Sequence, residues 1–364
     1  MSVGRLQLYP TFGAALGYDD NVTLSNDRPI SSRYLLLEPG VRAELTGRRS
    51  RLRAQYRLSD GDFADSNRDD FTDQFFDLGW GYQASVRSEW QIDARWHEAH
   101  DRRGEALREN FAATLDRDVD EYRDQGLGVT YRYGASGARG RLAVFANLAD
   151  RRYLNNRDFT REGDFEQSGI GGEFSWRTGA RTTALVRASR TDIDYDVNIR
   201  DSVQRQLALG LRWGGAPTSD VRLLVGRLER SARLEGQADF QGLFWEAAAS
   251  WRPLERSEFS LLTSRATDEA FGGASFLVRE RHSLGWRHQW RSRLSSSLDL
   301  SWADEDLRPN GRADDIQQVG LSVDYTFRRW MLVGLGWRHV ERNSSSNRFD
   351  YRRNEVLLSM QVSL

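Results

Sequence analysis

The chain ends in the stretch Glu355-Val356-Leu357-Leu358-Ser359-Met360-Gln361-Val362-Ser363-Leu364, in which apolar and polar side chains largely alternate. Alternation with a period of two predicts a β-strand with one apolar and one polar face. The apolar face carries Val356, Leu358, Met360, Val362 and Leu364. What covers that face decides the fold, and apolar rows of the same kind elsewhere in the chain indicate how it is covered.

Similar apolar rows occur from one end of the chain to the other: Leu52/Ala54/Tyr56/Leu58, Phe76/Leu78/Trp80/Tyr82, Leu127/Val129/Tyr131/Tyr133, Leu207/Leu209/Leu211/Trp213, Leu243/Trp245/Ala247/Ala249/Trp251 and Met331/Val333/Leu335/Trp337. Short connections (47–50, 178–181 and 328–329) alternate with long polar ones (60–70, 101–121, 304–315 and 341–350). This pattern predicts about eighteen strands of about ten residues, joined by nine long outer loops and eight short periplasmic turns.

The composition favours a barrel in a membrane. The 364 residues are 39% hydrophobic and 29% charged, with 12 Trp, 12 Tyr and 17 Phe. No apolar window reaches the 18 or more residues that a transmembrane helix needs. Barrels of the outer membrane combine a polar lumen, an apolar outer band and aromatic girdles, and lipid does not tolerate an open sheet edge. We therefore predict an all-β fold, a single transmembrane antiparallel up-and-down β-barrel domain over residues 1–364.

A soluble all-β protein, such as a propeller or a long sandwich, is the alternative. A propeller would show repeats of about forty residues with shared motifs, and the sequence has none. The persistent alternation of long and short connections also favours the barrel.

If the apolar rows face lipid, the residues between them line the lumen. This predicts a lumen wall of Arg51, Arg53, Arg57, Asp93, Arg95, His97, Arg132, Glu173, Arg177, Arg212, Arg222, Glu246, Arg287, Asp299, Asp324 and Arg338. Arginine outnumbers carboxylate, and guanidinium groups bind carboxylates at two points. The wall is therefore expected to favour acidic or heavily hydroxylated solutes. Alternatively, the mixed charges only pair across strands and hold the wall together.

The longest loop, 101–121, has two alternatives of its own. It can fold into the lumen and set a constriction, or it can lie on the surface. Its apolar stretch, Phe111-Ala112-Ala113-Thr114-Leu115, suits packing against a wall.

No catalytic, cofactor or metal site is predicted. Cysteine is absent, so the chain has no disulfide and no thiolate site. His97-Glu98-Ala99-His100 has the wrong spacing for a zinc protease, which needs His at i and i+4 on a helix. No Gly-x-Ser-x-Gly motif occurs, and the acidic runs lack the spacing of a calcium loop. The net charge of −1 indicates no nucleic-acid partner.

The step Gly17-Tyr18-Asp19-Asp20-Asn21-Val22, after the first predicted strand, resembles an outer-membrane family described as putative β-barrel porin 2. Asp and Asn can end a strand by bonding their own backbone. The resemblance implies a porin-like exit route for an exopolysaccharide, with periplasmic or inner-membrane polysaccharide assembly proteins as partners and no catalytic residues. The chain ends in Leu364, where many barrels end in Phe.

These observations lead to three hypotheses of function. The first is a passive channel that exports an acidic exopolysaccharide, and the second is a general or solute-selective diffusion porin for uptake. The third is an outer-membrane barrel enzyme, which we do not favour. We expect a monomer surrounded by outer-membrane lipid. Met1-Ser2-Val3-Gly4-Arg5 lacks the apolar core of a signal peptide. We therefore expect the signal peptide to have been removed.

Overall fold

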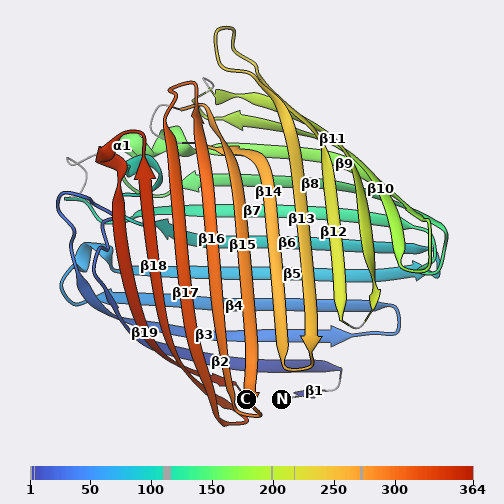
Figure 1. Ribbon diagram of the computed structural model, residues 1–364, viewed down its shortest axis with the longest axis horizontal. Coiled ribbons are helices and arrows are strands. Elements are labelled where there is room, and N and C mark those ends of the chain that lie inside the picture. Colours follow the sequence, from blue (N-terminus) through green and yellow to red (C-terminus); the bar gives the residue numbers. More distant parts are fainter. Residues whose placement is uncertain are drawn as a thin grey trace.

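The protein is a closed antiparallel barrel (Figure 1). The computed structural model describes residues 2–3, 5–109, 116–197, 200–216, 218–270 and 274–363. The strands of the first half are β2 (Leu6–Asp19), β3 (Ser32–Thr46), β4 (Ser50–Phe63), β5 (Phe71–Ser85), β6 (Ser88–Asp101), β7 (Asp120–Tyr133), β8 (Gly140–Tyr153), β9 (Phe165–Arg177) and β10 (Thr182–Tyr195). Each pairs with its neighbours in the sequence. A short strand, β1 (Ser2–Val3), pairs with the start of β2.

The strands of the second half are β11 (Ser202–Ala216), β12 (Ser219–Ala232), β13 (Phe240–Leu254), β14 (Ser257–Glu269), β15 (Phe276–Arg291), β16 (Leu294–Arg308), β17 (Ala313–Arg328), β18 (Met331–Ser344) and β19 (Tyr351–Ser363). Pairing of β19 with β2 closes the ring. The prediction of an up-and-down barrel with about eighteen strands is thereby confirmed.

The strands extend further than predicted. Each of β2 to β19 has 13 to 16 residues, not about ten. The expected loop 304–315 is mostly strand, because β16 and β17 stay paired as far as Asp306 and Ala313. The expected loop 341–350 likewise shrinks to 345–350. Backbone groups continue to pair beyond the apolar rows because each buried N–H and C=O needs a partner, whatever its side chain.

The apolar rows lie on the outside of the barrel. The side chains of Leu207, Leu209 and Leu211 are 59%, 65% and 43% exposed. In water this exposure would be unfavourable, but a lipid bilayer solvates such a surface. Among the residues that the structure describes, no helix is long and apolar enough to span a bilayer.

The two ends of the barrel differ. Both termini lie at the end of the short turns, and the helix α1 (Arg157–Thr160) lies at the other end (Figure 1). The 3-10 turns η1 (Asn67–Asp69), η2 (Ala106–Arg108), η4 (Arg161–Gly163) and η6 (Asn347–Phe349) are in the longer connections as well. In outer-membrane barrels the short turns are periplasmic, so η2 and α1 belong to the outer end.

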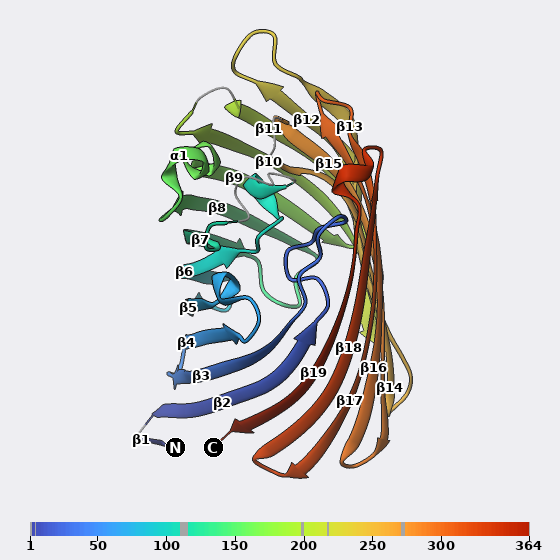
Figure 2. The same ribbon diagram turned by 90° about the vertical axis from the view of Figure 1, so that its left-hand side faces the viewer.

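A dry corner occupies part of the interior, which the sequence analysis did not predict. Leu224, Leu228 and Phe244 form a buried cluster. They lie on the inward face of the sheet, because Leu223 and Val225, which alternate with Leu224 along β12, are exposed on the outward face. A side chain at Gly226 would collide with the carbonyl oxygen of Leu207. The absence of that side chain lets β11 and β12 pair at this position, where Gly226 lies opposite Ala208 of the same buried cluster. The cluster lies where the wall turns from β10 to β13 (Figure 2).

The seam between the first and last long strands is held by buried charge. Arg353 on β19 donates from Nε to Asp19 on β2, at 2.7 Å, and both side chains are buried. The Asn21 side-chain amide also donates to the backbone oxygen of Arg352. The Gly17–Val22 step therefore helps to close the barrel.

Candidate functional site: the lumen wall and the outer mouth

The strand register places all sixteen predicted lumen residues on one face of the sheet. Paired residues in an antiparallel sheet share a face: for example, Arg212 pairs with Arg222, and Arg53 with Gly79. Nine of the sixteen line two cavities inside the barrel: Arg51, Arg53, Asp93, Arg95, Arg132, Glu173, Arg177, Arg212 and Arg222. The other seven, Arg57, His97, Glu246, Arg287, Asp299, Asp324 and Arg338, lie elsewhere on that face.

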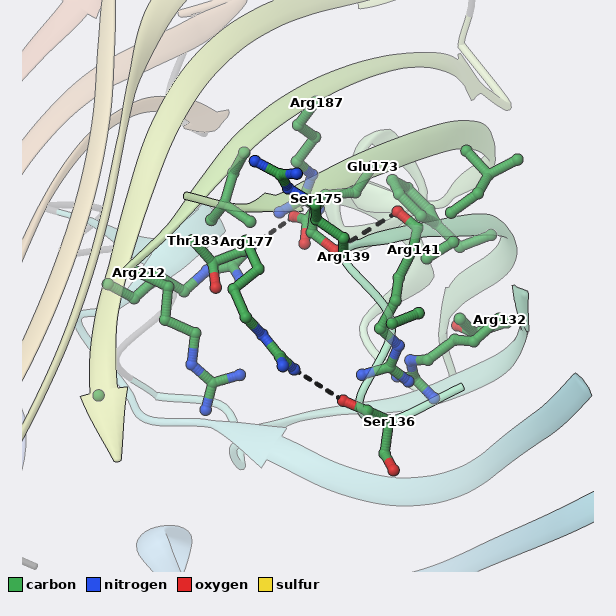
Figure 3. A pocket seen from close by; sticks show the side chains of 18 of the residues that line it. Arg132, Ser136, Arg139, Arg141, Glu173, Ser175, Arg177, Thr183, Arg187 and Arg212 are labelled. Atoms are coloured by element: carbon green, nitrogen blue, oxygen red, sulfur yellow. Dashed lines mark hydrogen bonds and ion pairs between the residues drawn. The ribbon is translucent and has the colours of Figure 1, made fainter. Parts of the chain in front are cut away.

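The larger cavity has a volume of about 880 Å³ and lies toward the short turns of β7 to β12 (Figure 3). Its charged lining consists of Arg132, Arg139, Arg141, Arg177, Arg181, Arg187, Arg212 and Arg222, with Asp93, Glu173 and Asp220. Eight arginines therefore face three carboxylates. In a site of lower dielectric than water, an excess of positive charge attracts anions strongly.

Some of these arginines are paired and others are not. Arg222 contacts Glu173 at 2.6 Å between Nη2 and Oε2. Arg177 donates to the backbone oxygen of Ser136 at 3.0 Å (Figure 3). Arg187 has its guanidinium 5.1 Å from the centre of the Phe145 ring, and its buried Nε has no hydrogen-bond partner. Within the described part of the chain Arg187 and Arg181 have no ion pair with a carboxylate, so both can bind a solute.

A second cavity of about 660 Å³ adjoins the first, since Asp93, Gly128 and Asn147 line both. Arg51 and Arg53 in this cavity both contact Glu44, at 2.9 and 3.2 Å. The two cavities together form a continuous lining from β4 to β12 that is rich in arginine.

The facing wall carries small residues at inward positions. Ser297 and Ser322 share a hydrogen bond of 2.7 Å between their hydroxyls, and Gly320 and Gly334 lie on neighbouring strands. The lumen is therefore asymmetric, because arginines crowd one side, whereas small residues stand between scattered charges such as Arg287 and Asp299 on the other.

Among the remaining predicted residues, several are paired across strands. Arg57 contacts Glu38 at 2.8 Å, and His97 contacts Asp77 at 3.0 Å. Both alternatives for the charged wall therefore have a structural counterpart, since some arginines stabilise the wall and others remain available.

Two loops occupy the outer mouth. In Figure 2 the segment after β2 and the segment around η2 lie between the two walls. A side chain at Gly104, whose φ is +93°, would collide with the carbonyl oxygen of Thr23, so the loops are in close contact. Arg103, which is buried, donates to Asp69 at 2.8 Å. Packed and hydrogen-bonded chain thus lies across part of the mouth.

Glu109 connects the 102–109 segment to the opposite wall. Its Oε2 lies 2.6 Å from Arg312 Nη2, and its Oε1 lies 2.7 Å from Arg342 Nη1. Asp314 contacts the same two arginines. For residues 102–109 this agrees with the inward-folding alternative. The apolar stretch Phe111 to Leu115 lies outside the described residues.

Four arginines of the large cavity were missed by the sequence analysis: Arg139, Arg141, Arg181 and Arg187. Arg139 and Arg181 lie in short turns, which were treated only as connections. The alternation of Leu185, Arg187 and Ser189 does indicate one face of β10, but the apolar Leu185 on that face conceals it. Among the described residues no group of histidines and carboxylates could hold a metal.

Comparison with known proteins identifies the family. The family model described as "putative beta-barrel porin 2" matches residues 1–364. The chain belongs to this family. The resemblance at Gly17–Val22 is therefore confirmed, and the barrel is a porin-like channel of the outer-membrane type. A search among curated proteins gives no match.

Solved porins share the fold. Pseudomonas aeruginosa OpdK, solved with vanillate, has a TM-score of 0.55 and 11% identity, covering 98% of this chain and 99% of its own. P. aeruginosa OccK2 (OpdF) in complex with glucuronate has a TM-score of 0.54 and 11% identity, covering 99% and 98%. Acinetobacter baumannii OccAB3 has a TM-score of 0.51 and 10% identity over the whole of both chains. At these identities the likeness concerns the fold alone.

Proposed function

We propose that this porin is a passive diffusion channel for small solutes that carry a carboxylate. The observation that carries the proposal is the cavity of about 880 Å³ in which eight arginines face three carboxylates. Vanillate and glucuronate, which accompany the OpdK and OccK2 structures, are both carboxylates. Guanidinium groups bind such anions with charge-assisted hydrogen bonds.

Arg187 and Arg181 are the residues that we expect to contact the solute. Neither is engaged by a carboxylate of the described wall, so their removal leaves no acidic group unpaired. Phe145 and Leu185 lie in the same cavity and provide an apolar surface beside the charges. A planar or ring-shaped carboxylate suits this combination.

The test is ion selectivity in planar bilayers. The wild-type channel should favour chloride over potassium, and glucuronate should block it. In the variant Arg181→Gln/Arg187→Gln, the loss of two charged hydrogen bonds, each worth about 1.5 kcal/mol, raises the half-blocking concentration roughly 100-fold. Arg190→Gln is the matched control, because Arg190 is on the same strand but the opposite face, where it contacts Asp192. Equal block in the double variant and the wild type would refute the proposal.

Export of an acidic exopolysaccharide remains a second candidate. The same arginine-rich wall suits an acidic polymer, and the family resemblance led to this hypothesis. The loops across the outer mouth favour small solutes instead, because a polymer requires an open path throughout its passage. Deletion of the gene should leave secreted polysaccharide unchanged and lower the uptake of small carboxylates. The reverse phenotype would favour export.

A further inference from the structure

The end of the barrel with the short turns carries an excess of exposed arginine. We call the following six residues the short-turn rim: Arg48, Arg49, Arg87, Arg256, Arg293 and Arg329. They come from the connections β3–β4, β5–β6, β13–β14, β15–β16 and β17–β18. In the described short turns the sole carboxylate is Glu255. The rim is therefore strongly cationic although the whole chain has a net charge of −1.

None of the rim arginines has an ion pair with the described part of the protein. Two carboxylates on the adjoining strands are already occupied. Glu44 is contacted by Arg51 at 2.9 Å, and Glu258 by Arg252 at 3.1 Å. At the outer end, in contrast, Arg103 and Arg108 are buried and bonded to aspartates. The rim charges therefore have no carboxylate partner within the described barrel wall, and Arg49 donates only to the backbone oxygen of Ala84, at 3.4 Å.

The rim lies beside aromatic side chains on the outer face. Trp290 and Trp330 are about half exposed and adjoin the last two of these turns. Two further arginines at this end contact such rings: Arg139 is 5.3 Å from the Trp176 ring centre, and Arg328 is 5.6 Å from that of Phe327. Trp and Tyr collect at the level of lipid headgroups. The rim is therefore at the depth where phosphate groups are found.

We propose that the short-turn rim binds the phosphate groups of anionic phospholipids around that end of the barrel. A guanidinium group matches a phosphate with two parallel hydrogen bonds, and basic residues near a membrane surface attract anionic lipid. The arginines come from turns on both walls of the barrel. Lipid surrounds a barrel on every side, whereas a single docked protein contacts one part of it. The arrangement therefore favours lipid over a protein partner.

The test uses the full barrel in vesicles of brominated phosphatidylglycerol mixed with unbrominated phosphatidylcholine, and in the converse mixture. Bromine quenches tryptophan at contact, so the 12 tryptophans together report the lipid around the barrel. Trp290 and Trp330 lie beside the rim, and the difference between the rim variant and the control isolates the lipid at that place. The test variant is Arg256→Gln/Arg293→Gln/Arg329→Gln, which removes the rim arginines of the turns next to Trp290 and Trp330. The control is Arg28→Gln/Arg161→Gln/Arg348→Gln, which removes three exposed arginines of the outer loops that have no ion pair in the described chain.

The wild type and the control should both prefer phosphatidylglycerol, and the rim variant should lose most of that preference. Each arginine near an anionic surface contributes up to about a fivefold gain in lipid affinity at low salt. Molar salt should abolish the preference, because its screening length is about 3 Å. A rim variant with wild-type preference overturns the proposal. Polyglutamate serves as a probe for an acidic protein partner. The proposal is also overturned if the rim binds polyglutamate while brominated phosphatidylglycerol and brominated phosphatidylcholine quench the tryptophans equally.

Discussion

Neutralising Glu109 should open the outer mouth. In the variant Glu109→Gln the side chain keeps its shape and one carbonyl oxygen, but it loses the charge that Arg312 and Arg342 share. The 102–109 segment is then held to the opposite wall by a weaker contact. The wall itself is spared, because Asp314 still contacts both arginines.

The magnitude follows from the two contacts. A hydrogen bond to a charged group contributes about 1.5–3 kcal/mol, and Glu109 accepts two, at 2.6 and 2.7 Å. Its side chain is 15% exposed and that of Arg342 is 8% exposed, so solvent screens the contact only weakly. Loss of about half of the interaction amounts to about 1.5–3 kcal/mol. This raises the ratio of open to closed mouths roughly 10- to 150-fold.

Single-channel recording in planar bilayers measures this change directly. Glu109→Gln should show longer and more frequent open states than the wild type. Glu105→Gln is the matched control, because Glu105 lies in the same segment and loses the same charge but is exposed and has no ion pair in the described chain. Both variants should keep the heat-modifiable mobility of a folded barrel. A folded Glu109→Gln barrel with wild-type dwell times would refute the idea that this contact controls the mouth.

Three further changes test other parts of the structure. Gly226→Leu should prevent barrel formation, because the new side chain collides with the backbone. The readout is the loss of heat-modifiable mobility. Gly128→Ala should fold normally, because no atom lies nearer than 3.9 Å to a Cβ at that position. Asp19→Asn removes one of the two carboxylates that contact the buried guanidinium of Arg353, Glu355 being the other. It should lower the free energy of unfolding by about 1.5 kcal/mol in urea titrations. The hydrogen bond from Arg117 lowers the pKa of Asp158. The contact between the two side chains should therefore be fully present above the ordinary pKa of a carboxyl group. It should be lost as the pH falls through the lowered pKa of Asp158. Carboxyl NMR titration should show this pKa returning toward its usual range in Arg117→Gln.

Sequence patterns predicted the barrel because they report a local property. The row Leu207, Leu209 and Leu211 specifies which face of a strand meets lipid, whatever its neighbours are. The same reasoning predicted which charged residues share the opposite face. It did not predict the dry corner, because Leu224 lies between Leu223 and Val225, and a continuous apolar run conceals which residue faces inward.

Contacts between distant segments lay beyond such reasoning. Glu109 and Arg342 are 233 positions apart, and nothing in either neighbourhood indicates the other. Their contact depends on the diameter of the ring and on the path of a loop, both of which arise only after all strands have paired. Strand ends were mispredicted for a related reason. Polar residues such as those of 304–315 resemble a loop in composition, but their backbone remains paired.

The contacts at the outer mouth bear on the size of the solute that can pass through the barrel. A small solute needs the mouth only briefly, so a contact of a few kcal/mol at Glu109 allows passage through rare openings. A polymer occupies the mouth as long as it threads, and the contacts of residues 102–109 with Arg312 and Arg342 would stay broken throughout. That sustained cost is absent for a solute small enough for the cavity of about 880 Å³. The outer mouth, rather than the arginine wall, therefore favours uptake over export, because the wall suits an acidic polymer as well as a small carboxylate.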